Sequence, residues 1–294
     1  MGQTAILVLF LIAILSLLAE WPKRRLTEVL HRRPSLIWIA PVLLTLVFSA
    51  AAVYMNAWRL ALALLVLGYT SAPVLCAVIQ GTGPVDRPSA LDVVTILLLW
   101  LPIEFAAGAS LIPRPAQGFL HSVAYGIAIL VGLILFIGFR SMPGLKFNLP
   151  RYARDYWLPF AAFAILAPVL AILGVAIGFI PPLHASAQSA GRMISAVAIV
   201  FAGTALPEEI LFRSLIQNLL MLRFGQNIRI LFLAAFIFGC AHLDNGPQPL
   251  PNWRYMILAT IAGVAYGFVF RKASTVLSSA GLHMLVDWTK HFFF

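Results

Sequence analysis

Long runs of apolar residues dominate this chain, and short polar or turn-rich segments separate one run from the next. Several runs approach or exceed the roughly 20 residues that a helix needs to cross a bilayer. Apolar and polar positions do not alternate as they do in the strands of a membrane barrel, so the pattern predicts helices. The expected fold class is all-α, a polytopic transmembrane bundle of about ten helices. The expected spans are residues 4–20, 35–55, 59–80, 91–112, 119–139, 157–180, 193–222, 229–243, 254–271 and 273–289.

Composition supports lipid as the solvent of this protein. Hydrophobic residues make up 62% of the chain and charged residues 10%, whereas a soluble domain carries about 25% charged residues. The formal net charge is +10, but the basic residues gather between the apolar runs, where Lys and Arg orient a membrane protein. This placement argues against a nucleic-acid partner. Cys76 and Cys240 lie within apolar runs and are interpreted as small hydrophobic residues.

A few carboxylates lie within the expected membrane spans, where a charged group is energetically unfavourable. The four that fall deep within expected spans are Glu104, Glu208, Glu209 and Asp287. An ionisable group at the bilayer centre costs at least about 2.5–3.5 kcal/mol, so it marks a functional site by default. Three of the four lie in the last third of the chain, together with His242 and His283.

The first cluster is the segment Pro207-Glu208-Glu209-Ile210-Leu211-Phe212-Arg213. On a helix, Glu209 and Arg213 share a face and are expected to form an ion pair. Glu208 is turned about 100° away from that face, so it is freer to act chemically. The alternative is an ion pair that only holds two helices together.

Two histidine segments complete the set. Phe238 lies one helical turn before His242 and is placed to shield its ring from water. His283 and Asp287 are four residues apart on one helix face, so the carboxylate is expected to orient the imidazole and fix its tautomer. The alternatives are an ordinary interfacial or core histidine, and a hydrogen bond between two helices.

Burying any one of these polar groups in lipid is energetically costly unless the others form hydrogen bonds or ion pairs with it. The sequence therefore predicts one shared polar pocket. A glutamate in an apolar pocket can activate a water molecule together with a histidine, and a second histidine can donate to an oxyanion. This describes amide hydrolysis. The chain has no serine or cysteine in a nucleophile motif and no His-Glu-x-x-His helix. No cofactor is expected, and a divalent metal at Glu208, His242 and His283 is a less favoured alternative.

The three segments, in this order, resemble the CAAX prenyl endopeptidase and bacteriocin-processing (CPBP, Abi) family of intramembrane glutamic proteases. The matching residues are Glu208, Glu209, Arg213, Phe238, His242, His283 and Asp287. The resemblance implies that Glu208 is the general base, that His242 assists it, and that His283 and position 287 stabilise the oxyanion. Glu209, Arg213 and Phe238 would be supporting residues. Asp287 departs from the asparagine common in the family, and an ionised aspartate would repel an oxyanion, so it is expected to orient His283 or to stay protonated.

The resemblance divides the chain into residues 1–185, N-terminal transmembrane helices of unassigned role, and residues 186–294, the catalytic region. Glu104 is left outside the expected site. The pattern Gly263-Val-Ala-Tyr-Gly267 is interpreted as a surface for close helix packing. The expected partners are the lipid bilayer and a peptide or protein substrate, lipid-anchored or exported, and the expected location is a bacterial inner (plasma) membrane. A proton-coupled transporter and a non-catalytic immunity or scaffold protein are the alternative functions.

Overall fold

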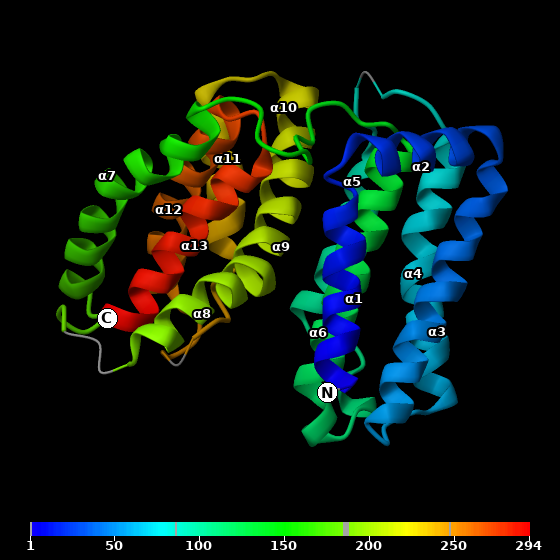
Figure 1. Ribbon diagram of the computed structural model, residues 1–294, viewed down its shortest axis with the longest axis horizontal. Coiled ribbons are helices and arrows are strands. Elements are labelled where there is room, and N and C mark those ends of the chain that lie inside the picture. The colour runs from blue at the N-terminus through cyan, green and yellow to red at the C-terminus, as the bar shows by residue number, and fades with distance from the viewer. Residues whose placement is uncertain (1, 86, 185–187, 247) are drawn as a thin grey trace. The chain divides into compact units, whose positions relative to one another are not determined.

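The structure is a computed structural model that describes residues 2–85, 87–184, 188–246 and 248–294. These residues form helices and connecting turns without a strand, as expected for an all-α protein (Figure 1). The chain divides into two compact units, Met1–Pro143 and Gly144–Phe294. Among the described residues, six helices are long and apolar enough to cross a membrane, or seven if a bent helix pair counts as one span. The protein is therefore a multi-pass membrane protein, and the expected count of about ten spans is not confirmed.

The first unit is a bundle in which α4 packs between α3 and α5, and α6 contacts α1, α3 and α5. Residues 21–34, between two expected spans, are not a loop: α2 covers most of them and bends by 85° from α1. The elements of this unit are α1 (Gly2–Ser16), α2 (Glu20–Arg32), η1 (Pro34–Trp38), α3 (Ile39–Tyr54), α4 (Leu60–Gln80), α5 (Ala90–Glu104), η2 (Ala109–Leu111), α6 (Arg114–Leu133) and η3 (Ile134–Phe139).

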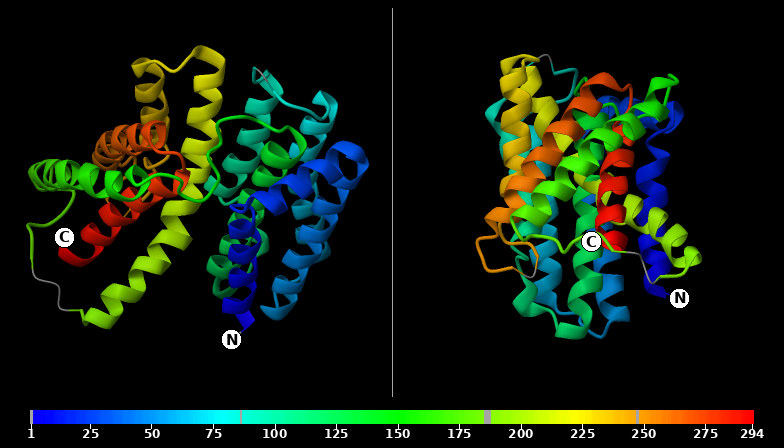
Figure 2. Two further views of the ribbon diagram at one scale, coloured as in Figure 1. Left: turned by 45° about the horizontal axis from the view of Figure 1, so that its top comes forward. Right: turned by 90° about the vertical axis from the view of Figure 1, so that its left-hand side faces the viewer.

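The second unit is built around one long helical rod, residues 190–224, with α11, α12 and α13 packed along it and α7 against α12 and α13 (Figures 1 and 2). Its elements are α7 (Arg154–Ala176), α8 (Ala190–Val200), η4 (Phe201–Ala205), α9 (Leu206–Glu209), η5 (Ile210–Gln217), α10 (Asn218–Phe224), α11 (Ile228–Cys240), α12 (Trp253–Lys272) and α13 (Val276–Phe293). At 13 residues, α11 is shorter than the span expected at 229–243.

Buried polar groups hold α13 in place at its start. The Asp155 carboxylate at the start of α7 accepts hydrogen bonds from the Ser274 backbone N–H at 2.8 Å and from the Ser274 hydroxyl. The Thr275 hydroxyl caps α13 by accepting from Leu277 N–H at 3.2 Å. Because α13 carries two of the predicted site residues, these bonds fix the site against α7.

The glycine pattern on α12 allows close packing against α11, as predicted. A Cβ atom on Gly263 would lie 3.1 Å from the Phe238 ring and 3.2 Å from the Ala235 Cα. Such contacts leave no room for a larger side chain. The close approach brings the Phe238 ring of α11 to 6.0 Å, centroid to centroid, from the Tyr266 ring of α12.

Candidate active site

Glu208 and Glu209 lie at an irregular point of the long rod. They sit in α9, a short α-helical stretch between the two π-helical stretches η4 and η5. Pro207 precedes them, and a proline inside a helix removes a backbone hydrogen bond. π-Helical stretches occur often at functional sites, because they redirect side chains out of the regular helical register.

The predicted ion pair is present. Arg213 Nε lies 3.1 Å from Glu209 Oε2, and both side chains are completely buried. The other two guanidinium nitrogens have no hydrogen-bond partner among the described residues. The guanidinium carbon lies 4.8 Å from the centre of the Phe238 ring, and the negative face of this ring stabilises the cation.

His283 is where the acidic residues converge. Its Nδ1 lies 3.2 Å from Glu209 Oε1, and its Nε2 lies 3.4 Å from Asp287 Oδ2 and 3.9 Å from Glu208 Oε2. An ionised carboxylate only accepts hydrogen bonds, so Nδ1 carries a hydrogen and donates it to Glu209. Glu209 therefore directs Nε2 of His283 toward the other two carboxylates. The expected contact between Asp287 and His283 is present, and Glu209 is a second orienting group.

Glu208 and Glu209 differ in their surroundings, as predicted from their different helix faces. The Glu209 side chain is 0% exposed, whereas that of Glu208 is 22% exposed. Glu208 thus keeps access to the outside of the protein while it lies beside His283. Sequence reasoning paired Glu208 with His242, and the structure also places Glu208 beside His283.

His242 follows the end of α11 and is 7% exposed. Its Nδ1 lies 2.8 Å from the Phe238 carbonyl oxygen, which can only accept, so Nδ1 carries a hydrogen. In the neutral ring, Nε2 then carries the lone pair and is available as a base. The Phe238 ring is 1% exposed and lies 4.7 Å from the His242 ring, in the shielding position expected from the sequence.

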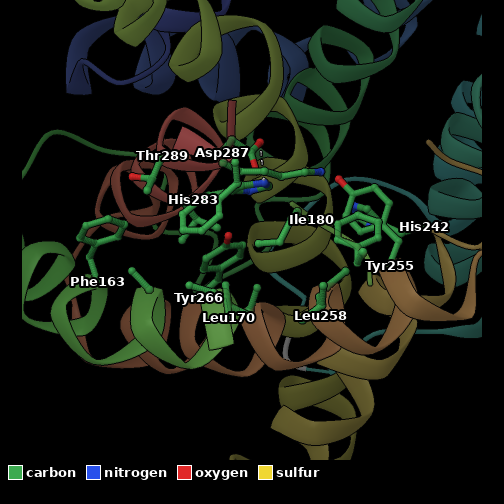
Figure 3. Close-up of a pocket in the computed structure, with 18 of the residues that line it drawn as sticks. Phe163, Leu170, Ile180, His242, Tyr255, Leu258, Tyr266, His283, Asp287 and Thr289 are labelled. Atoms are coloured by element: carbon green, nitrogen blue, oxygen red, sulfur yellow. Dashed lines mark ion pairs between the residues drawn. The ribbon is translucent and has the colours of Figure 1, made fainter. Parts of the chain in front are cut away.

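His242, His283 and Asp287 line one cavity, part of which is open to the outside. Figure 3 shows Tyr266 in the middle of the group, with His283 and Asp287 beside it, and His242 with Tyr255 to one side. Apolar residues of α7 and α12, such as Phe163, Leu170 and Leu258, form much of the remaining wall. The predicted shared pocket thus brings together both histidines and Asp287, with Glu208 in contact through His283.

Sequence reasoning missed several residues of this cavity. Tyr255, Tyr266 and Lys290 line it, and so does α7, which lies outside the motif region. A lone tyrosine in an apolar helix gives no periodic or charge signal. Tyr266 was hidden in the glycine pattern that predicts packing, whereas Lys290 was detectable as a cation one turn beyond Asp287.

Three other residues that the sequence singled out, Glu104, Cys76 and Cys240, are not among the residues that line this cavity. The Glu104 carboxylate at the end of α5 accepts a hydrogen bond from Trp100 Nε1 at 2.8 Å. Cys76 and Cys240 are both free thiols. Within the described part of the chain, no three His, Cys, Asp or Glu side chains are arranged to hold a metal ion.

Comparison with known protein families indicates the class of protein. Residues 190–289 match the family model described as type II CAAX prenyl endopeptidase Rce1-like. This region belongs to the Rce1-like family. The match runs from the first residues of α8 to Thr289 of α13, and it contains all seven residues that the sequence motifs singled out. No curated protein and no solved structure matches the chain. The match to the Rce1-like model over residues 190–289 indicates a protease.

Proposed function

We propose that this protein is an intramembrane endopeptidase that hydrolyses a peptide bond near the membrane with water activated by Glu208 and His242. The observation that carries the proposal is the convergence of Glu208, Glu209 and Asp287 on His283, within 3.2–3.9 Å, beside a cavity that His242 also lines. Three carboxylates around one imidazole are costly in an apolar protein unless they serve chemistry.

Each residue has a distinct proposed role. Glu208 is the general base, because it is the partly exposed member of the acidic pair. His242 assists through its Nε2 lone pair and shares the proton removed from water. His283 stabilises charge on the reacting carbonyl, and Asp287 orients it. Glu209 and Arg213 form the buried pair that holds the imidazole, and Phe238 packs against both histidines.

The substrate is a peptide or protein segment that reaches the site from the bilayer or its surface, lipid-anchored or exported. The proposed location is a bacterial inner (plasma) membrane. Residues 186–294 are the proposed catalytic region, and residues 1–185 carry accessory helices. The compact second unit begins earlier, at Gly144, and includes α7, whose residues Phe163 and Leu170 line the cavity. We therefore propose that α7 belongs functionally with the catalytic region.

The proposed mechanism uses no metal ion. In the alternative mechanism, which depends on a metal, Glu208, His242 and His283 would be the ligands. We expect cleavage by the purified chain to survive dialysis against a chelator and to gain nothing from added zinc. Loss of cleavage on chelation, with recovery when zinc is restored, would assign these residues to a metal site instead.

The test compares protein termini in cells that express the wild-type chain, Glu208→Gln or His242→Ala at equal levels. Terminus-selective mass spectrometry of membrane and exported proteins gives the readout. We expect a small set of termini that is present with the wild-type chain and absent with both variants. If both variants insert normally and every terminus is unchanged, the protein is not a peptidase. Proton-coupled flux in vesicles would then indicate a transporter, and full cellular function of Glu208→Gln would indicate a scaffold or immunity protein.

A further inference from the structure

Hydrolysis of a peptide bond needs more than a base, because negative charge develops on the carbonyl oxygen in the transition state. Hydrogen-bond donors placed at that oxygen supply much of the rate enhancement in acyl-transfer enzymes. The groups nearest His283 are three carboxylates, which repel such an oxygen when they are ionised. A neutral donor beside His283 would therefore add to the stabilisation that His283 provides.

Most donors on the cavity wall are already used. The His242 Nδ1 hydrogen goes to the Phe238 carbonyl oxygen, and the His283 Nδ1 hydrogen goes to Glu209. The Thr289 hydroxyl donates to the Leu285 carbonyl oxygen at 2.7 Å. The ammonium group of Lys290 lies 4.4 Å from the centre of the Tyr255 ring and 4.8 Å from that of Phe179, so it is engaged by these two rings.

The hydroxyls of Tyr255 and Tyr266 differ from these donors. Both residues line the cavity, and no hydrogen bond of either hydroxyl is resolved among the described residues. Neither hydroxyl oxygen is among the buried polar atoms that lack a partner, so a ligand in the cavity can reach both and accept their hydrogen bonds.

The rings of the two tyrosines make different contacts. The Tyr266 ring stacks on the His283 ring, with centroids 4.6 Å apart and planes inclined by 21°. The phenol therefore lies alongside the imidazole on which the carboxylates converge. Tyr255 instead packs its ring against His242, with centroids 4.6 Å apart, and carries the Lys290 ammonium on its face. Figure 3 shows this arrangement, with Tyr266 central and Tyr255 beside His242.

We propose that Tyr266 is a further catalytic residue, whose phenol hydroxyl donates a hydrogen bond to the carbonyl oxygen of the substrate as negative charge develops there. The assignment rests on the proposed peptidase function. Water activated at Glu208 attacks a carbonyl beside His283, and the stacked phenol is the donor within reach of that carbonyl. Tyr266 donates the hydrogen bond without losing its proton, so no charge is added to a site already rich in carboxylates.

The substitution Tyr266→Phe tests the role cleanly, because it removes only the hydroxyl. The ring contacts to His283, Phe238 and the Arg213 guanidinium remain. Tyr255→Phe is the matched control, since it removes the other unpartnered hydroxyl of the same cavity. The probe is a fluorogenic peptide that spans a cleavage site identified by the comparison of termini, and the enzyme is the full chain in lipid nanodiscs.

We expect Tyr266→Phe to lower kcat about 10²- to 10³-fold, with KM and the unfolding temperature close to those of the wild-type chain. Tyr255→Phe should lower kcat less than about tenfold, because its ring packs against His242 and does not stack on His283.

The outcomes separate the two proposals. If the wild-type chain cleaves no peptide, both the peptidase function and the role of Tyr266 are overturned. If the wild-type chain cleaves and Tyr266→Phe retains its kcat, or Tyr255→Phe loses more, the peptidase stands and Tyr266 is not the donor.

Discussion

Each of the two units buries one arginine against a carboxylate, and the two clusters differ in how completely their hydrogen bonds are satisfied. In the first unit, all three guanidinium nitrogens of Arg140 donate, to the Asp92 carboxylate, to the Gln80 side chain and to the Gln80 and Gly81 carbonyl oxygens. In the second unit, one nitrogen of Arg213 donates to Glu209, and the others face aromatic rings.

The carboxylates differ in the same sense. Asp92 is 1% exposed and also accepts from the Ser89 backbone N–H at 2.8 Å, within the capping box that begins α5. The second carboxylate oxygen of Glu209 contacts His283. The His283 ring also contacts Asp287 and Glu208, which are both partly exposed. The first cluster is closed and links helix ends, whereas the second leads to a titratable ring at a cavity.

A π-helical stretch does not separate the two clusters, because both have one. η3 ends directly before Arg140, and η5 contains Arg213. Buried charge and irregular helix geometry therefore do not identify an active site by themselves. The distinguishing feature is a chain of polar contacts that ends at groups open to a ligand.

The largest effect is expected for His283→Ala, which removes the centre of the open cluster. Hydrolysis should fall at least about 10³-fold, and the fold should lose about 3–5 kcal/mol, because buried Glu209 loses a partner. Peptide cleavage and thermal unfolding of the purified chain measure the two effects. His291→Ala, at an exposed position of the same helix, should change neither. A fully active His283→Ala chain would remove the distinction between the clusters.

Asp92→Asn tests the closed cluster. We expect a loss of about 3–5 kcal/mol in stability, because Arg140 is left buried without its counterion. The cleavage rate per folded molecule should stay at the wild-type value. Denaturant titration and active-site-normalised kinetics check this pair of expectations. A fall in kcat at full folding would show that the first unit takes part in the chemistry.

Phe238→Leu tests the aromatic contacts of the cluster in the second unit. Phe238 lies against His242, His283, Phe212 and the Arg213 guanidinium. The variant should lose about 1–3 kcal/mol in stability and about tenfold in kcat, because both histidine rings gain freedom. Phe136→Leu, at an equally buried position of the first unit, should lose similar stability and keep its kcat. Equal kinetic effects in the two variants would indicate a general loss of rigidity.

The smallest effects concern glycine packing. Gly263→Ala places a methyl group 3.1 Å from the Phe238 ring, so we expect a loss of about 1–3 kcal/mol from overpacking. Gly68→Ala, where no atom lies within 4 Å of the added carbon, should be neutral or stabilising by up to about 1 kcal/mol. Thermal unfolding of the two variants decides the matter, and an unchanged Gly263→Ala chain would show that α11 and α12 are not tightly packed.

The sequence was sufficient for the helical class and for much of the site. Residues three and four apart on a helix meet by geometry alone, so the Glu209–Arg213 and His283–Asp287 contacts were predictable. Contacts between helices were not, because periodicity does not say which helices are neighbours. For that reason the contact of Glu208 with His283, and the wall formed by α7, emerged only from the structure. The helical segment α2 was missed because its charges resemble a loop between spans.

The central claim is that Glu208 activates water, and the most direct measurement is the cleavage rate of the Glu208→Gln chain. The variant keeps the shape of the side chain and removes its basicity. With the purified full chain and a peptide spanning an identified cleavage site, kcat should fall at least about 10³-fold, while the unfolding temperature and peptide binding stay at wild-type values. A Glu208→Gln chain that folds, binds and cleaves at the wild-type rate would contradict the account.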